Sequence, residues 1–377
     1  MEGWENWRFA NDFGYFHTKK YFEYQEIYAT LILHDKIKES GDWSMSGLFR
    51  ALHRTKVFRN LTEQEFAWVL YDVGNSAFIM LACSLIPNWF KSLAIGTGPG
   101  KISSDQATAY YSIAISIVTV VVALIGPVCG VLADRKDKKK IFFTTTAGLG
   151  ITGCVLNGVA TSWVLFLVIY IVTRVCYNAS LTIYDSMLND VTTEERMDEV
   201  SSYGYAWGYL GSCIPFLVAL IAYVLGPDMV GVLPDFVSKM IGFCVTALWW
   251  LGVTLPLLKE YRQKNYVEMR TVTVGQTFGK IFRTLKKIAV SDRKVFFFLI
   301  GFFLYIDGVG TIIDNCINIG TDLNLNTVGQ VVFLLATQVV AFGGSLFFAK
   351  LSRKKDTVSL ILICIAGYFV ICLYALT

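Results

Sequence analysis

Apolar residues along the chain fall into nine blocks of roughly 20, separated by polar or basic stretches. A helix needs about 20 residues to cross a hydrocarbon core about 30 Å thick, because it rises about 1.5 Å per residue. The predicted membrane-spanning helices cover residues 66–90, 109–133, 141–160, 161–185, 202–225, 237–258, 295–320, 328–350 and 358–376. This pattern predicts an all-α membrane protein that crosses the bilayer many times.

The basic stretch of residues 259–294 divides these blocks into six and three. This division predicts an amino-terminal extension (1–62), a six-helix bundle (63–258), a cytoplasmic linker (259–294) and a partial second bundle of three helices (295–377). The stretch "LYDVGNSAF" is similar to "YIDGVGTIID", and "ADRKDKKK" is similar to "AKLSRKKD". Weak internal repeats of this kind are expected in a protein built from two related bundles. We therefore expect a chain truncated from twelve helices.

The distribution of basic residues predicts how the chain is oriented. Of the 33 Lys and Arg residues, 29 lie in the extension and in the loops on the same side as it. Loops rich in Lys and Arg stay in the cytoplasm, so we expect a cytoplasmic amino terminus. The net charge of +4 then reflects topology, and nucleic acid is not an expected partner.

Cysteine and histidine positions predict no metal or disulfide site. All nine cysteines fall within the apolar blocks, where reduced thiols behave as small hydrophobic residues. The three histidines precede the first block, and no HExxH motif occurs. Because no nucleophile–base pair or metal cluster is visible, we expect no cofactor, no metal and no enzymatic activity.

Charged and polar residues inside three of the blocks are the candidate functional residues. A charge in a bilayer costs about 2.5–3.5 kcal/mol, so such residues usually face a partner or a water-filled cavity. The candidates for substrate binding or proton coupling are Asp72 and Asn75 in the first block, Arg174 and Asn178 in the fourth, and Asp307, Thr311 and Asp314 in the seventh.

Two interpretations of these charges remain open. By position, Arg174 and Asp307 lie near the middle of their blocks, where Arg174 would meet an anionic group and Asp307 or Asp72 a cationic group or a proton. In the alternative, the charges form structural pairs that hold helices together. For Asp72, which lies near the inner end of its block, a hinge or capping role is equally open.

Small residues at a spacing of four predict close contacts between helices. Gly126 and Gly130 have this spacing in the second block, and Gly204, Gly208 and Ser212 have it in the fifth. We interpret both sets as packing positions.

The stretch "GVLADRKDKK" resembles the loop between helices two and three of the major facilitator superfamily, where a glycine, an Asp-Arg pair and basic residues form a cytoplasmic gate. Gly130, Asp134, Arg135 and Lys139 match this pattern. Asp137 stands where the family usually has a second glycine, which puts the shape of the turn in question.

Three longer stretches are similar to the vacuole-effluxer-like branch of that superfamily, the autophagy-related effluxers of fungi and their bacterial relatives. They are "WVLYDVGNSAF" (68–78), "YDSMLNDVTTEERMDEVSSYGYAWGYLGS" (184–212) and "YIDGVGTII" (305–313), and the resemblance covers residues 62–377. It implies twelve helices in two bundles and alternating access. Fungal members are associated with release of amino acids from the vacuole, whereas the compact loops favour a bacterial member in the cell membrane.

The predicted function is therefore secondary active transport of a small polar solute across the lipid bilayer, with amino acids favoured. A proton or a sodium ion is the expected coupling partner. Two alternatives stay open. One is a cation-coupled sugar symporter, which can share the Asp-rich blocks and the basic loop. The other is a non-transporting membrane sensor or an inactive fragment, with the aromatic extension as its functional part.

Overall fold

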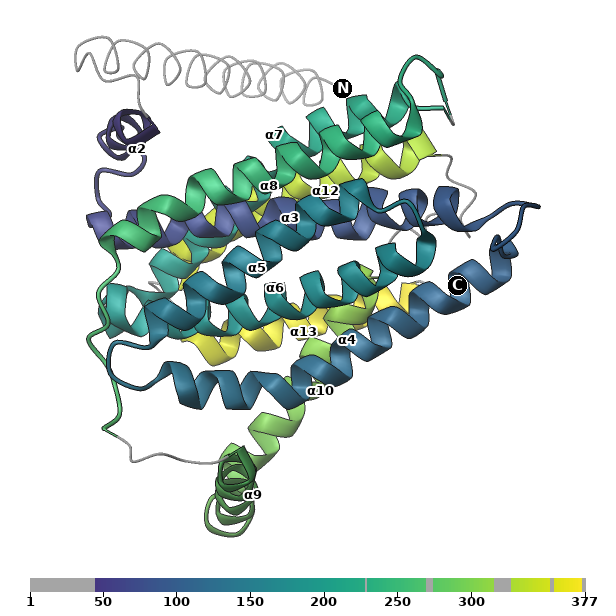
Figure 1. The fold of residues 1–377 in the computed structure, drawn as a ribbon. Helices are drawn as coiled ribbons and strands as arrows, with labels where there is room; N and C mark the ends of the chain where they lie inside the picture. The colour runs from purple at the N-terminus through teal and green to yellow at the C-terminus, as the bar shows by residue number, and fades with distance from the viewer. Residues whose placement is uncertain (1–44, 228, 269–273, 315–326, 353–355, 375–377) are drawn as a thin grey trace, which may run out of the picture. The chain divides into compact units, whose positions relative to one another are not determined.

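A computed structural model describes residues 45–377 apart from residues 228, 269–273, 315–326, 353–355 and 375–377 (Figure 1). The chain divides into two compact units, Met1–Phe66 and Ala67–Thr377. The α-helices are α2 (Met45–His53), α3 (Glu63–Ala94), α4 (Ser104–Ala133), α5 (Lys139–Val159), α6 (Trp163–Val191), α7 (Met197–Val224), α8 (Asp235–Glu260), α9 (Val274–Ser291), α10 (Arg293–Asp314), α12 (Thr327–Leu351) and α13 (Thr357–Tyr374). A short 3₁₀ turn, η1 (Glu194–Arg196), precedes α7.

In its described part, each of the nine predicted blocks overlaps one of the helices from α3 to α13, so the all-α prediction is confirmed. Seven helices in the described part of the chain are long and apolar enough to cross a membrane, all of them among the predicted blocks. Of the other two, α13 falls short of that length, and the predicted block at 295–320 runs past α10 into residues outside the description. The helices often extend beyond the apolar blocks, most clearly α6, which continues to Val191.

In the first unit, α2 is followed by a turn that leads into α3. The Nε2 of His53 donates to the carbonyl of Leu61 at 2.8 Å, and its ring stacks on that of Phe66 at 4.9 Å between centroids. Thr62 and Glu65 then form a reciprocal capping box, with backbone-to-side-chain distances of 2.7 and 3.2 Å. Such a box satisfies free N–H groups in the first turn and fixes where α3 begins.

In the second unit, α3 is the buried central helix. Its aromatic side chains meet rings from the helices around it: Tyr71 meets Phe143 of α5, Phe78 meets Trp250 of α8, and Phe90 meets Tyr111 of α4. Around α3, helix α5 packs against α6 and α8, α4 packs against α6, and α7 packs against α8. Helix α3 is thus positioned to present polar residues to several helices at once.

The outer faces of the helices are apolar. On α4, α10 and α13, large side chains such as Val120, Phe303 and Phe369 are exposed by about 60% or more. An apolar exterior over helices of this length suits hydrocarbon, in which the backbone is satisfied within each helix.

The helices after residue 274 also belong to the second unit. Helix α12 packs along α7, where Trp207 and Phe342 meet edge to face at 5.5 Å. Tyr305 of α10 meets Tyr368 of α13 at 6.2 Å. Helix α9 contacts α4 and α10 and is seen nearly end-on in Figure 1, whereas those two helices run across the view.

Candidate functional site

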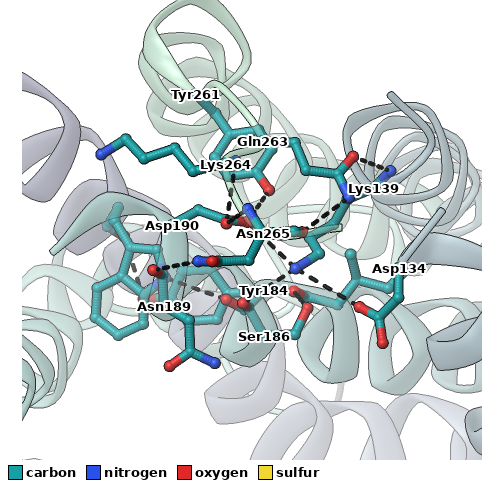
Figure 2. A network of polar contacts seen from close by, with 12 residues as sticks. Asp134, Lys139, Tyr184, Ser186, Asn189, Asp190, Tyr261, Gln263, Lys264 and Asn265 are labelled. Carbon is teal, nitrogen blue, oxygen red and sulfur yellow. Dashed lines mark hydrogen bonds and ion pairs between the residues drawn. The ribbon is translucent and has the colours of Figure 1, made fainter. Parts of the chain in front are cut away.

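A polar network centred on Asp190 lies where α6 and α8 end and α5 begins (Figure 2). Asp190 is fully buried in the last turn of α6. Its Oδ1 accepts hydrogen bonds from the backbone N–H groups of Lys264, at 3.1 Å, and Asn265, at 2.7 Å. Its Oδ2 accepts from the Nζ of Lys139, at 3.2 Å, and from the hydroxyl of Tyr261. One carboxylate thus joins α5, α6 and the segment that follows α8.

Lys139 is the cation of this network and is almost completely buried. Its Nζ also donates to the carbonyl of Ser186 at 3.4 Å and lies 3.6 Å from Oδ1 of Asp134. The Asp134 side chain is 47% exposed, and exposed ion pairs contribute little to stability. The main counter-charge of Lys139 is therefore Asp190, although Asp134 was the acidic residue predicted for this site.

The segment after α8 is also attached through its backbone. The N–H of Val267 donates to the carbonyl of Asp134 at 2.9 Å, and Val267 forms an isolated β-bridge with Arg135. The side-chain amide of Asn265 donates to the carbonyl of Asn189 at 2.9 Å. These contacts tie the loop between α4 and α5 to the ends of α6 and α8.

Tyr261 donates the shortest bond of the network. Burial, followed by the hydrogen bond to Asp190, raises the pKa of Tyr261. The phenol therefore keeps its proton at neutral pH and is the donor to the carboxylate. A buried ion pair repays its desolvation only when its remaining polar atoms are hydrogen-bonded, and Asp190 meets this condition on both oxygens.

The predicted gate residues lie at the edge of this network. Helix α4 ends as the N–H of Asp134 donates to the carbonyl of Gly130 at 3.0 Å. Asp137 has a φ of +58°, the left-handed conformation that glycine adopts freely and that aspartate tolerates better than most residues. The turn therefore has a left-handed residue at the position where the resembling family carries glycine.

A second buried carboxylate, Asp72, lies on α3. Its side chain is 8% exposed, and its Oδ1 accepts from the amide of Asn75 at 3.1 Å. That amide also donates to the carbonyl of Tyr71 at 3.3 Å. The structure thus brings Asp72 and Asn75 together, within one turn of a helix.

Two glycines of α7 provide the space that Asp72 occupies. A Cβ at Gly204 would lie 3.1 Å from Oδ2 of Asp72, and one at Gly208 would lie 2.8 Å from Oγ of Ser76. The predicted packing role of these glycines is confirmed. A Cβ at Gly126 or Gly130 would meet no described atom within 4 Å, so the same interpretation is not confirmed for α4.

Trp68 on α3 and Tyr184 on α6 join these helices close to Asp72. The indole N–H of Trp68 donates to the carbonyl of Tyr184 at 3.1 Å, and the Tyr184 hydroxyl donates to the carbonyl of Trp68, also at 3.1 Å. The two rings stack with centroids 4.3 Å apart. The side of Asp72 toward α6 is therefore rigid.

Arg174 lies on α6 and is 8% exposed. Its guanidinium carbon is 5.8 Å from the ring centroid of Tyr177, within the range of a cation–π contact. The Tyr177 ring also meets Phe78 and Trp250. The amide of Asn178 donates to the carbonyl of Arg174 at 2.8 Å. Arg174 thus lies beside an aromatic cluster contributed by α3, α6 and α8.

The predicted residues of the seventh block lie on α10, where the side chain of Asp307 is exposed. Because α10 is helical as far as Asp314, positions 307, 311 and 314 share one face. The side chains of Thr311 and Asp314 lie outside the described residues. Arg174 is buried and Asp307 is exposed, so their meeting at the membrane midplane stays a prediction.

The sequence did not point to Asp190, the acid that pairs with Lys139, or to Tyr261, the phenol that donates to Asp190. Asp190 lies beyond the apolar block, in a stretch interpreted as a loop, and Tyr261 lies in the predicted linker. A signal was present in the polar stretch "YDSMLND", whose polar residues continue at helical spacing past the end of the predicted block. Extending the predicted helix through this stretch would have placed Asp190 on the same helix as Arg174.

A bundle of apolar helices that carries buried charges, with a basic loop between two of them, is typical of a multi-pass membrane protein of the transporter type. The family model for Vacuole effluxer Atg22 like proteins matches residues 62–377. The chain therefore belongs to the Atg22-like vacuole effluxer family of MFS-type transporters.

A curated relative is the uncharacterized MFS-type transporter YxiO of Bacillus subtilis (strain 168). It is 34% identical over 322 residues, which cover 85% of this chain and 74% of the relative. The predicted superfamily and branch are thus confirmed, and a bacterial member fits.

Proposed function

We propose that this protein moves a small polar solute, with amino acids as the favoured class, across the membrane by alternating access. The observation that carries the proposal is Arg174, a guanidinium buried in a helix of an MFS-type transporter. A guanidinium matches a carboxylate through two parallel hydrogen bonds, which are strong where water is excluded. An α-carboxylate is the anionic group that all amino acids share.

The acidic residues supply the opposite charge. We assign binding of the substrate ammonium group, or transfer of a coupling proton, to the set Asp72, Asp307 and Asp314, with Asn75, Asn178 and Thr311 as neighbouring polar groups. Asp72 is the best supported of these, because it is buried and has a neutral amide as its neighbour. A buried carboxylate of this kind can bind a proton or a sodium ion at low cost to the surrounding packing.

The loop after α4 is proposed as the cytoplasmic gate, formed by Gly130, Asp134, Arg135 and Lys139. Support comes from the network around Asp190, which fixes Lys139 and attaches the loop backbone to the segment after α8. A rigid loop can open and close against a second bundle as one body. We place it on the cytoplasmic side of the cell membrane, together with the extension and the linker between the proposed bundles, because these segments carry most of the basic residues.

Transport by the purified protein in proteoliposomes tests the proposal. Counterflow of a panel of radiolabelled amino acids, with and without proton or sodium gradients, should show uptake that Arg174→Gln abolishes. Lys259→Gln is the matched control, because it also removes one positive charge, from a side chain that is 78% exposed. Wild-type counterflow by the Arg174→Gln protein, or uptake of sugars and of no amino acid, would contradict the proposal.

The sensor alternative has its own test. Deletion of residues 1–60 should leave transport intact if the helices carry the function. Loss of transport by a deletion variant that still folds and melts like the full chain would favour a role centred on the extension.

A further inference from the structure

Helix α9, between α8 and α10, has two chemically different faces. Its apolar residues recur at spacings that place them on one stripe: Phe278, Ile281, Phe282, Leu285 and Ile288. Its described basic residues lie on the opposite side and one flank of the helix: Arg283, Lys286 and Lys287. Helix α9 carries no acidic residue.

The apolar stripe of α9 is open in the structure. Phe282 is 70% exposed and Leu285 is 41% exposed, although α9 contacts both α4 and α10. Exposed apolar stripes opposite a basic face are typical of helices that lie in the interface between lipid headgroups and acyl chains.

The chain on both sides of α9 places it at the level of the membrane surface. Before it, the segment that follows α8 is attached to the bundle end through Lys264 and Asn265. After it, α10 begins within two residues, and Oδ1 of Asp292 accepts from the N–H of Val295 at 3.3 Å in the first turn. Figure 1 shows α9 nearly end-on while α10 runs across the view, so the two helix axes cross steeply. A helix that crosses a membrane-spanning helix steeply at its end lies along the surface.

We propose that α9 is an interfacial helix whose apolar stripe inserts at the headgroup–acyl boundary and whose basic face binds anionic phospholipid headgroups. Charge complementarity selects this occupant, because α9 carries only positive charge and lies on the side where the basic loops gather. Anionic lipids enrich the cytoplasmic leaflet and attract basic residues held near the surface.

Thiol accessibility in proteoliposomes tests this inference without reference to transport. Single cysteines are introduced by Phe282→Cys or Leu285→Cys on the apolar stripe and by Val290→Cys on the side of the basic residues; all three positions are exposed in the structure. Their rates of reaction with a membrane-impermeant maleimide are measured in vesicles of phosphatidylcholine with phosphatidylglycerol. The rate for the unsubstituted chain is subtracted, which removes the contribution of the native thiols.

The proposal predicts labelling at positions 282 and 285 about tenfold slower than at 290, since an inserted stripe is shielded by lipid. Neutralising the basic face with Arg283→Gln, Lys286→Gln and Lys287→Gln, or omitting phosphatidylglycerol, should restore about tenfold faster labelling at 282. Equal rates at the three positions in anionic vesicles would overturn the insertion of α9. Protection that is unchanged by both neutralisation and neutral lipid would overturn the binding of anionic headgroups.

Discussion

Asp190 and Asp72 are both carboxylates buried in membrane-spanning helices, but their surroundings differ. Asp190 accepts four hydrogen bonds, one of them from a buried lysine. Among the described residues, the donor to the carboxylate of Asp72 is the amide of Asn75, and the glycines of α7 lie against it. The first arrangement fixes a charge in place, whereas the second leaves a carboxylate able to exchange its partner. Burial alone therefore does not distinguish the structural role of Asp190 from the role proposed for Asp72; the difference lies in the set of hydrogen-bond donors around each carboxylate.

The largest effect should come from breaking the network of Asp190. Asp190→Ala leaves Lys139 buried beside the more exposed Asp134, which should destabilise the protein by about 3–5 kcal/mol. Thermal melting in detergent would show a strongly lowered transition, and Asp190→Ala with Lys139→Met should recover part of it. Asp105→Asn, at an exposed carboxylate of α4, is the control. A melting temperature of Asp190→Ala equal to that of the control would contradict the structural role.

The packing around Asp72 should be the next most sensitive. Gly208→Ala places a methyl group 2.8 Å from Ser76 Oγ, and such overpacking costs about 1–3 kcal/mol. Gly126→Ala on α4 is the matched control, because an added Cβ there meets no described atom within 4 Å. The control should melt at or above the wild-type temperature, since alanine favours helix over glycine by about 1 kcal/mol. Equal losses in both variants would refute the close approach of α7 to α3.

An effect of similar size is expected when one donor of Asp190 is removed. Tyr261→Phe should cost about 1–3 kcal/mol, the penalty for losing a hydrogen bond to a buried charged group. Because the pKa of Tyr261 is raised in the folded state, its contribution is fully present below the unfolded tyrosine pKa of about 10 and is lost as pH rises above that value. The difference in melting temperature between wild type and Tyr261→Phe should thus narrow above about pH 10. A difference that is constant up to strongly alkaline pH would argue against this hydrogen bond.

The smallest effect concerns the turn beside the network. Asp137 has a positive φ, so Asp137→Gly should keep or slightly raise the melting temperature, whereas Asp137→Val should lower stability by about 1–2 kcal/mol. Both variants lack the carboxylate, so the difference between their melting temperatures reports the backbone strain alone. Equal behaviour of glycine and valine would show that the left-handed conformation does not matter.

The helices were predictable from the sequence because bilayer thickness sets their length and lipid sets their composition. Each predicted block contains a helix in its described part, and the glycine spacing of α7 led to a real close contact. The same spacing in α4 did not, because spacing does not say which helix lies opposite. Asp134 and Arg135 carry the resemblance of the loop to its family. The carboxylate that pairs with Lys139, however, is Asp190, which lies outside that motif. Its donors Lys264 and Asn265 come from an irregular segment whose path no periodicity predicts.

The relation between Arg174 and Asp307 shows another limit. Counting residues from the block ends placed both at mid-membrane, but depth does not give orientation. Arg174 lies among aromatic rings inside the bundle, whereas Asp307 is on an exposed face of α10. Their joint role is part of the proposed function.

The most direct test of the contrast between the two carboxylates is amino-acid uptake by Asp72→Asn in proteoliposomes under a proton or sodium gradient, measured beside its melting temperature. Asparagine keeps the size of the side chain but cannot hold a negative charge, so it removes both roles proposed for Asp72. We predict a protein that melts close to wild type and has lost gradient-driven uptake, with Lys259→Gln transporting normally. Wild-type gradient-driven uptake by a folded Asp72→Asn protein would contradict the contrast.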